Sequence, residues 1–158
     1  MTDITINKTI PKFSLPATGD KEISSGSLKG SNVVIYFYPK DNTPGCTREG
    51  LDFQANLLKF KRQNTIVLGV SRDSIKTHEN FRTKQGYKFD LLSDKDEVLC
   101  KLFDVIKMKN MYGKKVRGIE RSTFLIDEKG KLRQQWRKIK VDGHADEVLA
   151  AVKALNKA

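Results

Sequence analysis

Residues 33–47 read VVIYFYPKDNTPGCT, and this stretch decides how the chain is interpreted. The apolar run that ends at Tyr38 is typical of a buried strand, and two prolines and a glycine mark the loop after it. A helical pattern follows, which places Cys46 in the first turn of a helix. Unpaired backbone N–H groups and the positive end of the helix dipole favour a thiolate there.

The alternative for Cys46 is an ordinary buried cysteine, which is the most common environment of a free thiol. Buried cysteines usually lie within an apolar periodic element, whereas Cys46 has Pro, Gly and Thr as neighbours. Thr43 precedes it by three residues and carries a hydroxyl that can form hydrogen bonds. We therefore interpret Cys46 as a reactive thiol.

Strand-like and helix-like patterns alternate along the rest of the chain. We expect strands at 32–38, 65–71, 89–92 and 122–126, and a hairpin that returns through 131–136. We expect helices at 46–62, between Ser74 and Gly86, at 96–103 and after Gly143, and a loop at 107–115. This order indicates a layered α/β domain with a mixed sheet.

Apolar spacing predicts which helical side chains face the core. Two stripes occur in helix 46–62, one formed by Leu51, Ala55 and Leu58 and the other by Phe53, Leu57 and Phe60. In the later helices we expect these residues to point inward: Ile75, His78, Phe81, Val98, Leu99, Leu102, Phe103, Val148, Leu149, Val152 and Leu155.

The spacing of Pro39, Thr43 and Cys46 reproduces the Pro-x-x-x-Thr-x-x-Cys signature of peroxiredoxins. Further blocks match in order along the chain, namely SRDS at 71–74, LSD at 92–94, ERSTFLID at 120–127 and WRK at 136–138. The chain thus resembles the Q-type, or bacterioferritin comigratory, peroxiredoxins from about residue 3 to residue 155.

The resemblance implies a thioredoxin-like fold, with a central mixed sheet flanked by helices, in a single domain over residues 1–158. It implies a thiol peroxidase that reduces hydrogen peroxide and organic hydroperoxides through a sulfenic acid on Cys46, without metal, haem, flavin or other cofactor. Arg121 would stabilise the thiolate and bind peroxide, Thr43 would hydrogen-bond either one, and Pro39 would shield the pocket. From the residues alone, Arg121 could instead pair with Glu120 or Asp127. Glu49 is interpreted as structural, or as a support behind the reacting groups.

The positions at which many of these proteins carry a resolving cysteine hold Leu51 and Arg82. The other cysteine, Cys100, lies in the predicted helix 96–103, where packing in the core is its expected role. The expected reductant is therefore an external thiol, either thioredoxin or glutaredoxin with glutathione, and we expect the enzyme to act as a monomer.

The chain has a net charge of +11, which raises the alternative of a non-enzymatic redox-sensing or nucleic-acid-binding protein. The basic residues are dispersed and no nucleic-acid-binding motif occurs, so no specific nucleic-acid partner is expected.

A Cys–His hydrolase is a further alternative, with His78 or His144 as the partner of Cys46. Neither histidine has the spacing of a metal ligand. No secretory signal or membrane-spanning run is evident, so with the resemblance we expect a cytoplasmic protein.

Overall fold

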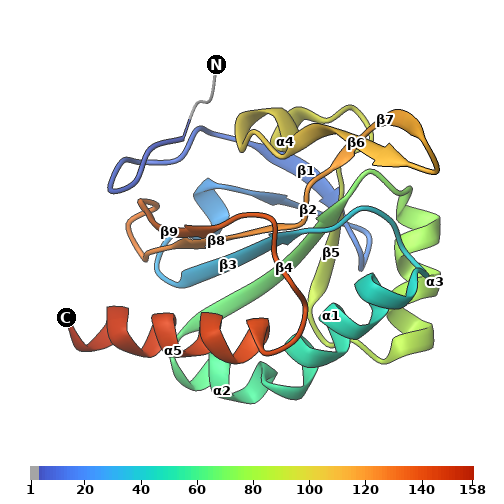
Figure 1. Cartoon of the computed structure of the whole chain (residues 1–158). Coiled ribbons are helices and arrows are strands. Elements are labelled where there is room, and N and C mark those ends of the chain that lie inside the picture. The colour runs from blue at the N-terminus through green and yellow to red at the C-terminus, as the bar shows by residue number, and fades with distance from the viewer. Residues whose placement is uncertain (1–3) are drawn as a thin grey trace.

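The structure is a computed structural model that describes residues 4–158, and a mixed β-sheet forms its centre (Figure 1). The strands of this sheet are β1 (Ser14–Ala17), β2 (Lys21–Ser24), β3 (Asn32–Phe37), β4 (Thr65–Ser71), β5 (Asp90–Ser93), β8 (Ser122–Ile126) and β9 (Leu132–Trp136). Within the described residues their order is β2-β1-β5-β4-β3-β8-β9. The pairs β3–β4 and β4–β5 are parallel and the other pairs are antiparallel.

Helices and a small hairpin surround the sheet. The helices are α1 (Pro44–Ala55), α2 (Leu57–Arg62), α3 (Ile75–Gln85), α4 (Val98–Leu102) and α5 (His144–Lys157), with a short 3-10 turn at Gly26–Leu28. The hairpin strands are β6 (Ile106–Met111) and β7 (Lys114–Ile119). Figure 1 shows α1, α2 and α5 on one side of the sheet, and α4 with the hairpin on the other side.

Alternating side chains of β3 build a separate core layer on each face of the sheet. Val33, Ile35 and Phe37 pack with α4 and the N-terminal segment. Val34 and Tyr36 point the other way and pack with side chains of α1, α2, α3 and α5. Successive side chains of a strand point to opposite faces, so a strand that is apolar throughout must be covered on both sides.

The predicted helix 46–62 is in fact two helices that meet at Asn56. The side-chain amide of Asn56 donates to the carbonyl of Asp52 at 3.0 Å, while its backbone N–H bonds to Phe53 instead. An Asn side chain that takes the place of its own backbone donor in this way interrupts a helix. The predicted Phe53 stripe is buried, but the predicted inward stripe of Leu51, Ala55 and Leu58 is wrong, because all three residues are exposed, Leu58 by 67%.

The predicted loop 107–115 is wrong, because these residues form most of the β6–β7 hairpin. Its turn places both Tyr112 and Gly113 at positive φ, at 53° and 79°. Asn-Gly or Asp-Gly usually occupies such a turn, so Tyr-Gly gave no clear signal. An ion pair between Arg117 of β7 and Glu97 helps to hold the hairpin against the body of the protein.

Most other predicted elements are confirmed. The strand at 65–71 matches β4, and Ser74 caps α3 by accepting from the N–H of Thr77 at 3.2 Å. The strands β1 and β2 had no counterpart among the expected elements, and Val98 is exposed rather than inward. The α/β class with a mixed sheet is confirmed. Among the described residues, no helix is both long and apolar enough to cross a bilayer.

Candidate active site

Cys46 lies in the first turn of α1, directly after the loop 39–43 that leaves β3. Thr43 is the N-cap residue and has an extended backbone (φ −94°, ψ 151°), as expected for the residue before a proline. Pro44 occupies the first helical position, where its missing N–H has no consequence. The predicted placement of Cys46 is therefore confirmed, and the residue is buried, with 2% of its surface exposed.

The start of α1 leaves backbone donors beside the thiol. The N–H of Thr47 donates to the carbonyl of Thr43 at 2.9 Å, which begins the helical hydrogen-bond ladder. The N–H groups of Gly45 and Cys46 precede that bond and have no acceptor within the helix. They carry the positive end of the helix dipole and favour a negative charge on the sulfur of Cys46 or on an oxygen bound next to it.

Arg121 contacts Cys46 although the two residues are distant in the sequence. Its Nη2 lies 3.4 Å from the Sγ of Cys46, and its Nη1 donates to Oε1 of Glu49 at 2.6 Å. Gly45 leaves room for this approach, because a Cβ at that position would lie 3.3 Å from Nη2 of Arg121 and would push the guanidinium back by a few tenths of an ångström. The structure therefore brings the predicted arginine to the predicted thiol, and its ion-pair partner is Glu49 rather than Glu120 or Asp127.

Glu49 is the acidic group of the site, and its burial was not expected from the sequence. Its side chain is only 2% exposed, and its Oε2 is buried without a hydrogen-bond partner. Burial raises the pKa of Glu49 from 4.5 to about 7, against the opposing effect of the Arg121 guanidinium. Burial opposes the charge of Arg121, but the facing Glu49 and Cys46 outweigh it and raise the pKa of Arg121. The available signal for a place near the thiol was the spacing of three residues from Cys46, which is about one helical turn.

Thr43 and Pro39 lie in the loop 39–43 before α1, and the Thr43 hydroxyl bonds to this loop rather than to the sulfur of Cys46. The hydroxyl of Thr43 donates to the carbonyl of Lys40 at 2.9 Å, which uses its only proton. The Thr43 oxygen can still accept a hydrogen bond but has no proton left for a thiolate. Pro39 is partly buried at the start of the same loop.

Tyr87 supports α1 from outside the predicted site. Its hydroxyl donates to the carbonyl of Thr47 at 3.0 Å. Gly50, one turn further along α1, makes room for the ring, since a Cβ there would lie 2.2 Å from the Tyr87 oxygen. No sequence pattern pointed to this contact, because the two residues belong to different elements.

Cys100 is separated from Cys46 by the sheet. Cys100 belongs to the core layer on the α4 side, and Cys46 belongs to the layer on the α1 side. Burial, with the nearby Asp94 carboxylate, raises the pKa of Cys100 and keeps it a protonated thiol. The predicted packing role of Cys100 fits this position.

Neither histidine pairs with Cys46 in the described structure. Nε2 of His144 lies 2.8 Å from the hydroxyl of Thr123, and His78 bonds to Asp41 and Leu92. The Cys–His hydrolase alternative therefore lacks its base.

Comparison with known proteins shows the family of this chain. Residues 6–135 match the model of the AhpC/TSA family. Peroxiredoxin Bcp of Xanthomonas campestris is 56% identical over 98% of both chains, and Peroxiredoxin Bcp of Bacillus subtilis is 41% identical over 97% of this chain and 98% of the relative.

Solved structures are similar as well. Peroxiredoxin Q of Xanthomonas campestris superimposes with a TM-score of 0.87 at 58% identity, covering 91% of each chain. Another structure from that organism, with 57% identity, a TM-score of 0.87 and coverage of 91% of this chain and 92% of its own, was described for the alkyl peroxide reduction activity of its bacterioferritin comigratory protein. These similarities confirm the thioredoxin-like fold. The chain therefore belongs to the AhpC/TSA family and is a peroxiredoxin, a thiol peroxidase.

Proposed function

We propose that Cys46 is the thiol that reacts with peroxide, and that Arg121 and the start of α1 stabilise the charge that moves in the reaction. The observation that carries this assignment is the guanidinium of Arg121, 3.4 Å from the sulfur of Cys46. A permanent cation and two free N–H groups next to one thiol favour the thiolate, which is the nucleophilic form. The same groups can receive a negatively charged oxygen.

The reaction proceeds by displacement at oxygen. The Cys46 thiolate attacks the terminal oxygen of ROOH, the one that carries the hydrogen; an S–O bond forms, and the O–O bond breaks with its electron pair going to RO⁻. RO⁻ takes up a proton and leaves as an alcohol, or as water when R is hydrogen, while Cys46 remains as a sulfenic acid. Thr43, whose own proton is held by Lys40, accepts a hydrogen bond from the peroxide hydroxyl. Pro39 limits the access of water from the loop side.

We propose that an external thiol completes the cycle. One reductant thiol attacks the sulfenic acid, releases water and leaves a mixed disulfide, and a second thiol of the reductant then frees Cys46. Support comes from Cys100, which is fully buried in the opposite core layer and stays protonated. A disulfide would require the two Cα atoms to come within about 7 Å. Thioredoxin and glutaredoxin with glutathione are the candidate reductants.

We further propose that the enzyme acts as a monomer in the cytoplasm. A net charge of +11 disfavours association between copies. Both cysteines are free thiols, and the proposed reductants, thioredoxin and glutaredoxin with glutathione, are systems that keep thiols reduced in the cytosol.

Steady-state peroxide consumption tests the assignment. Wild type, Cys46→Ser and Cys100→Ser are compared with thioredoxin, with glutaredoxin and glutathione, and with dithiothreitol. We expect Cys46→Ser to lose turnover with every reductant and Cys100→Ser to retain it. Turnover that survives in Cys46→Ser would refute the role of Cys46, and loss in Cys100→Ser would refute the external thiol.

A further inference from the structure

Asp41 is the one fully buried residue of the loop 39–43 that carries the chain from β3 to Cys46. Its surface is 3% exposed, whereas its neighbours Lys40 and Asn42 are exposed. A buried carboxylate is unfavourable unless charged or hydrogen-bonding partners compensate for the lost water. The partners of Asp41 therefore determine where this loop lies.

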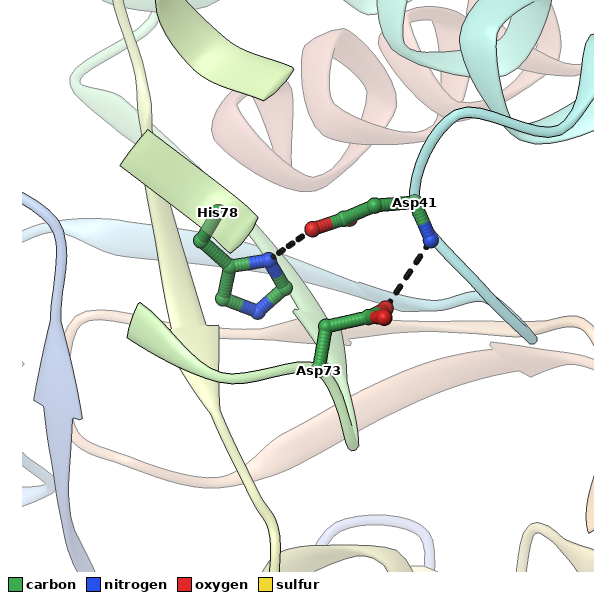
Figure 2. A group of neighbouring side chains, drawn as sticks. All are labelled: Asp41, Asp73 and His78. Carbon is green, nitrogen blue, oxygen red and sulfur yellow. Dashed lines mark hydrogen bonds and ion pairs between the residues drawn. The ribbon is translucent and has the colours of Figure 1, made fainter. Parts of the chain in front are cut away.

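Three groups hold Asp41. Oδ2 lies 2.6 Å from Nδ1 of His78, and Oδ1 accepts from the hydroxyl of Tyr38 at 2.6 Å. The backbone N–H of Asp41 donates to Oδ2 of Asp73 at 2.9 Å, so the loop is tied to the segment after β4 as well (Figure 2). His78 belongs to α3 and is itself completely buried.

Hydrogen-bond geometry requires a proton between His78 and Asp41. Nε2 of His78 lies 2.8 Å from the carbonyl oxygen of Leu92, which can only accept, so Nε2 carries a hydrogen. Nδ1 and the Asp41 oxygen would both be acceptors at 2.6 Å without a further proton. The pair therefore shares one proton, as imidazolium with carboxylate or as imidazole with carboxylic acid.

Asp41, Asp73 and His78 offer ligand atoms within 4.8 Å of one another, which is also the arrangement of a metal site. Both nitrogens of His78 are already engaged, one by Asp41 and one by Leu92. Asp73 is likewise engaged by Ser71 and by the backbone of Asp41. Within the described residues, both oxygens of Asp41, both ring nitrogens of His78 and Oδ2 of Asp73 already have hydrogen-bond partners. The cluster is therefore better explained as a clamp on the loop.

We propose that His78 is a positioning residue of the peroxidase reaction: through its proton shared with Asp41 it fixes the loop 39–43, and with it the start of α1 where Cys46 meets Arg121. The proposal rests on the role of Cys46 given above. Asp41 is only two residues from the N-cap Thr43, so a shift of Asp41 is passed to the first turn of α1. Misplacement of a reacting group by about 1 Å can slow a reaction about 100-fold.

Two substitutions of His78 separate the Asp41 bond from the Leu92 bond. The amide nitrogen of Asn is bonded to Cγ, as Nδ1 is in histidine. His78→Asn therefore keeps a donor for Asp41 and loses the hydrogen bond to the carbonyl of Leu92. The side chain of Gln is one atom longer, so His78→Gln keeps a donor for the carbonyl of Leu92 and loses the hydrogen bond to Asp41. The measurement is the second-order rate constant of Cys46 oxidation by hydrogen peroxide, by rapid quench, alongside the pH dependence of Cys46 alkylation.

We expect His78→Gln to react about 10-fold or more slowly and to alkylate with a midpoint at higher pH, and we expect His78→Asn to stay close to wild type in both. Equal rates in the two variants would overturn the proposal. If His78→Gln does not fold, Asp41→Asn and Asp41→Ala make the same comparison from the loop: the Asn amide can accept from Tyr38 and donate to His78, and Ala can do neither. There too, equal rates overturn it. A wild-type enzyme unreactive at Cys46 would refute the role of Cys46 instead.

Discussion

The carboxylate of Glu49 lies 2.6 Å from Nη1 of Arg121, and Nη2 of the same guanidinium faces the sulfur of Cys46 at 3.4 Å. Glu49 and Cys46 lie on consecutive turns of α1, so one planar cation spans both. A guanidinium presents its donors in a fixed fork, and the bond to Glu49 therefore orients the donor that faces the thiol. The ion pair positions the site as well as compensating the two buried charges.

Arg121→Ala should slow the reaction of Cys46 with hydrogen peroxide by about 100-fold, as for loss of a donor to a developing oxyanion. Arg121→Lys should restore the rate only in part, because an ammonium cannot face Glu49 and Cys46 in one plane. Stopped-flow oxidation gives both rates. Arg133→Ala is the matched control, since Arg133 pairs with Asp127 at 3.2 Å and should leave the rate unchanged. A normal rate in Arg121→Ala would assign Arg121 to structure alone.

The raised pKa of Glu49 makes stability depend on pH. Burial raises this pKa from 4.5 to about 7, so the native state holds the proton more tightly than the unfolded chain does. The contribution to the free energy of unfolding is fully present below about pH 4.5 and is lost as the pH rises through about 7, by at most about 3 kcal/mol.

Glu49→Gln should remove this pH dependence, because glutamine does not titrate. Urea unfolding at a series of pH values measures the free energy of unfolding as a function of pH, with Glu128→Gln as a control on the surface. A wild-type slope that persists in Glu49→Gln would contradict the assignment.

Gly50→Ala should destabilise the protein although alanine favours helices by about 1 kcal/mol. The added Cβ would lie 2.2 Å from the hydroxyl oxygen of Tyr87 and would push it off the carbonyl of Thr47. Overpacking of this kind costs about 1–3 kcal/mol. Thermal unfolding tests it against Gly26→Ala, where nothing lies within 4 Å of the added atom. Equal stability of the two variants would show that α1 adjusts without loss.

Local patterns in the sequence were sufficient to place Cys46. A strand, a Pro-Gly loop and a helix follow one another within a short stretch, and each has a strong local signal. The same is true of β4 and of α3 with its Ser74 cap. Arg121 was assigned by resemblance, because its contact with Cys46 depends on the pairing of β3 with β8, which no local pattern encodes.

Contacts between elements could not be predicted in the same way. The pairs Glu49–Arg121, Tyr87–Thr47 and Asp41–His78 each join residues that are far apart in the chain. Local features misled the prediction in two further places. The lysine-rich β6–β7 hairpin has few of the residues that favour strands, and Asn56 interrupts the helix without a proline or a glycine.

The most direct test of the account is the covalent state of both cysteines after one equivalent of hydrogen peroxide in the presence of dimedone. Digestion and mass spectrometry then locate the products. We predict one dimedone adduct on Cys46, with Cys100 still open to alkylation once the protein is unfolded. Oxidation of Cys100 alone, or a Cys46–Cys100 disulfide as the main product, would contradict the account.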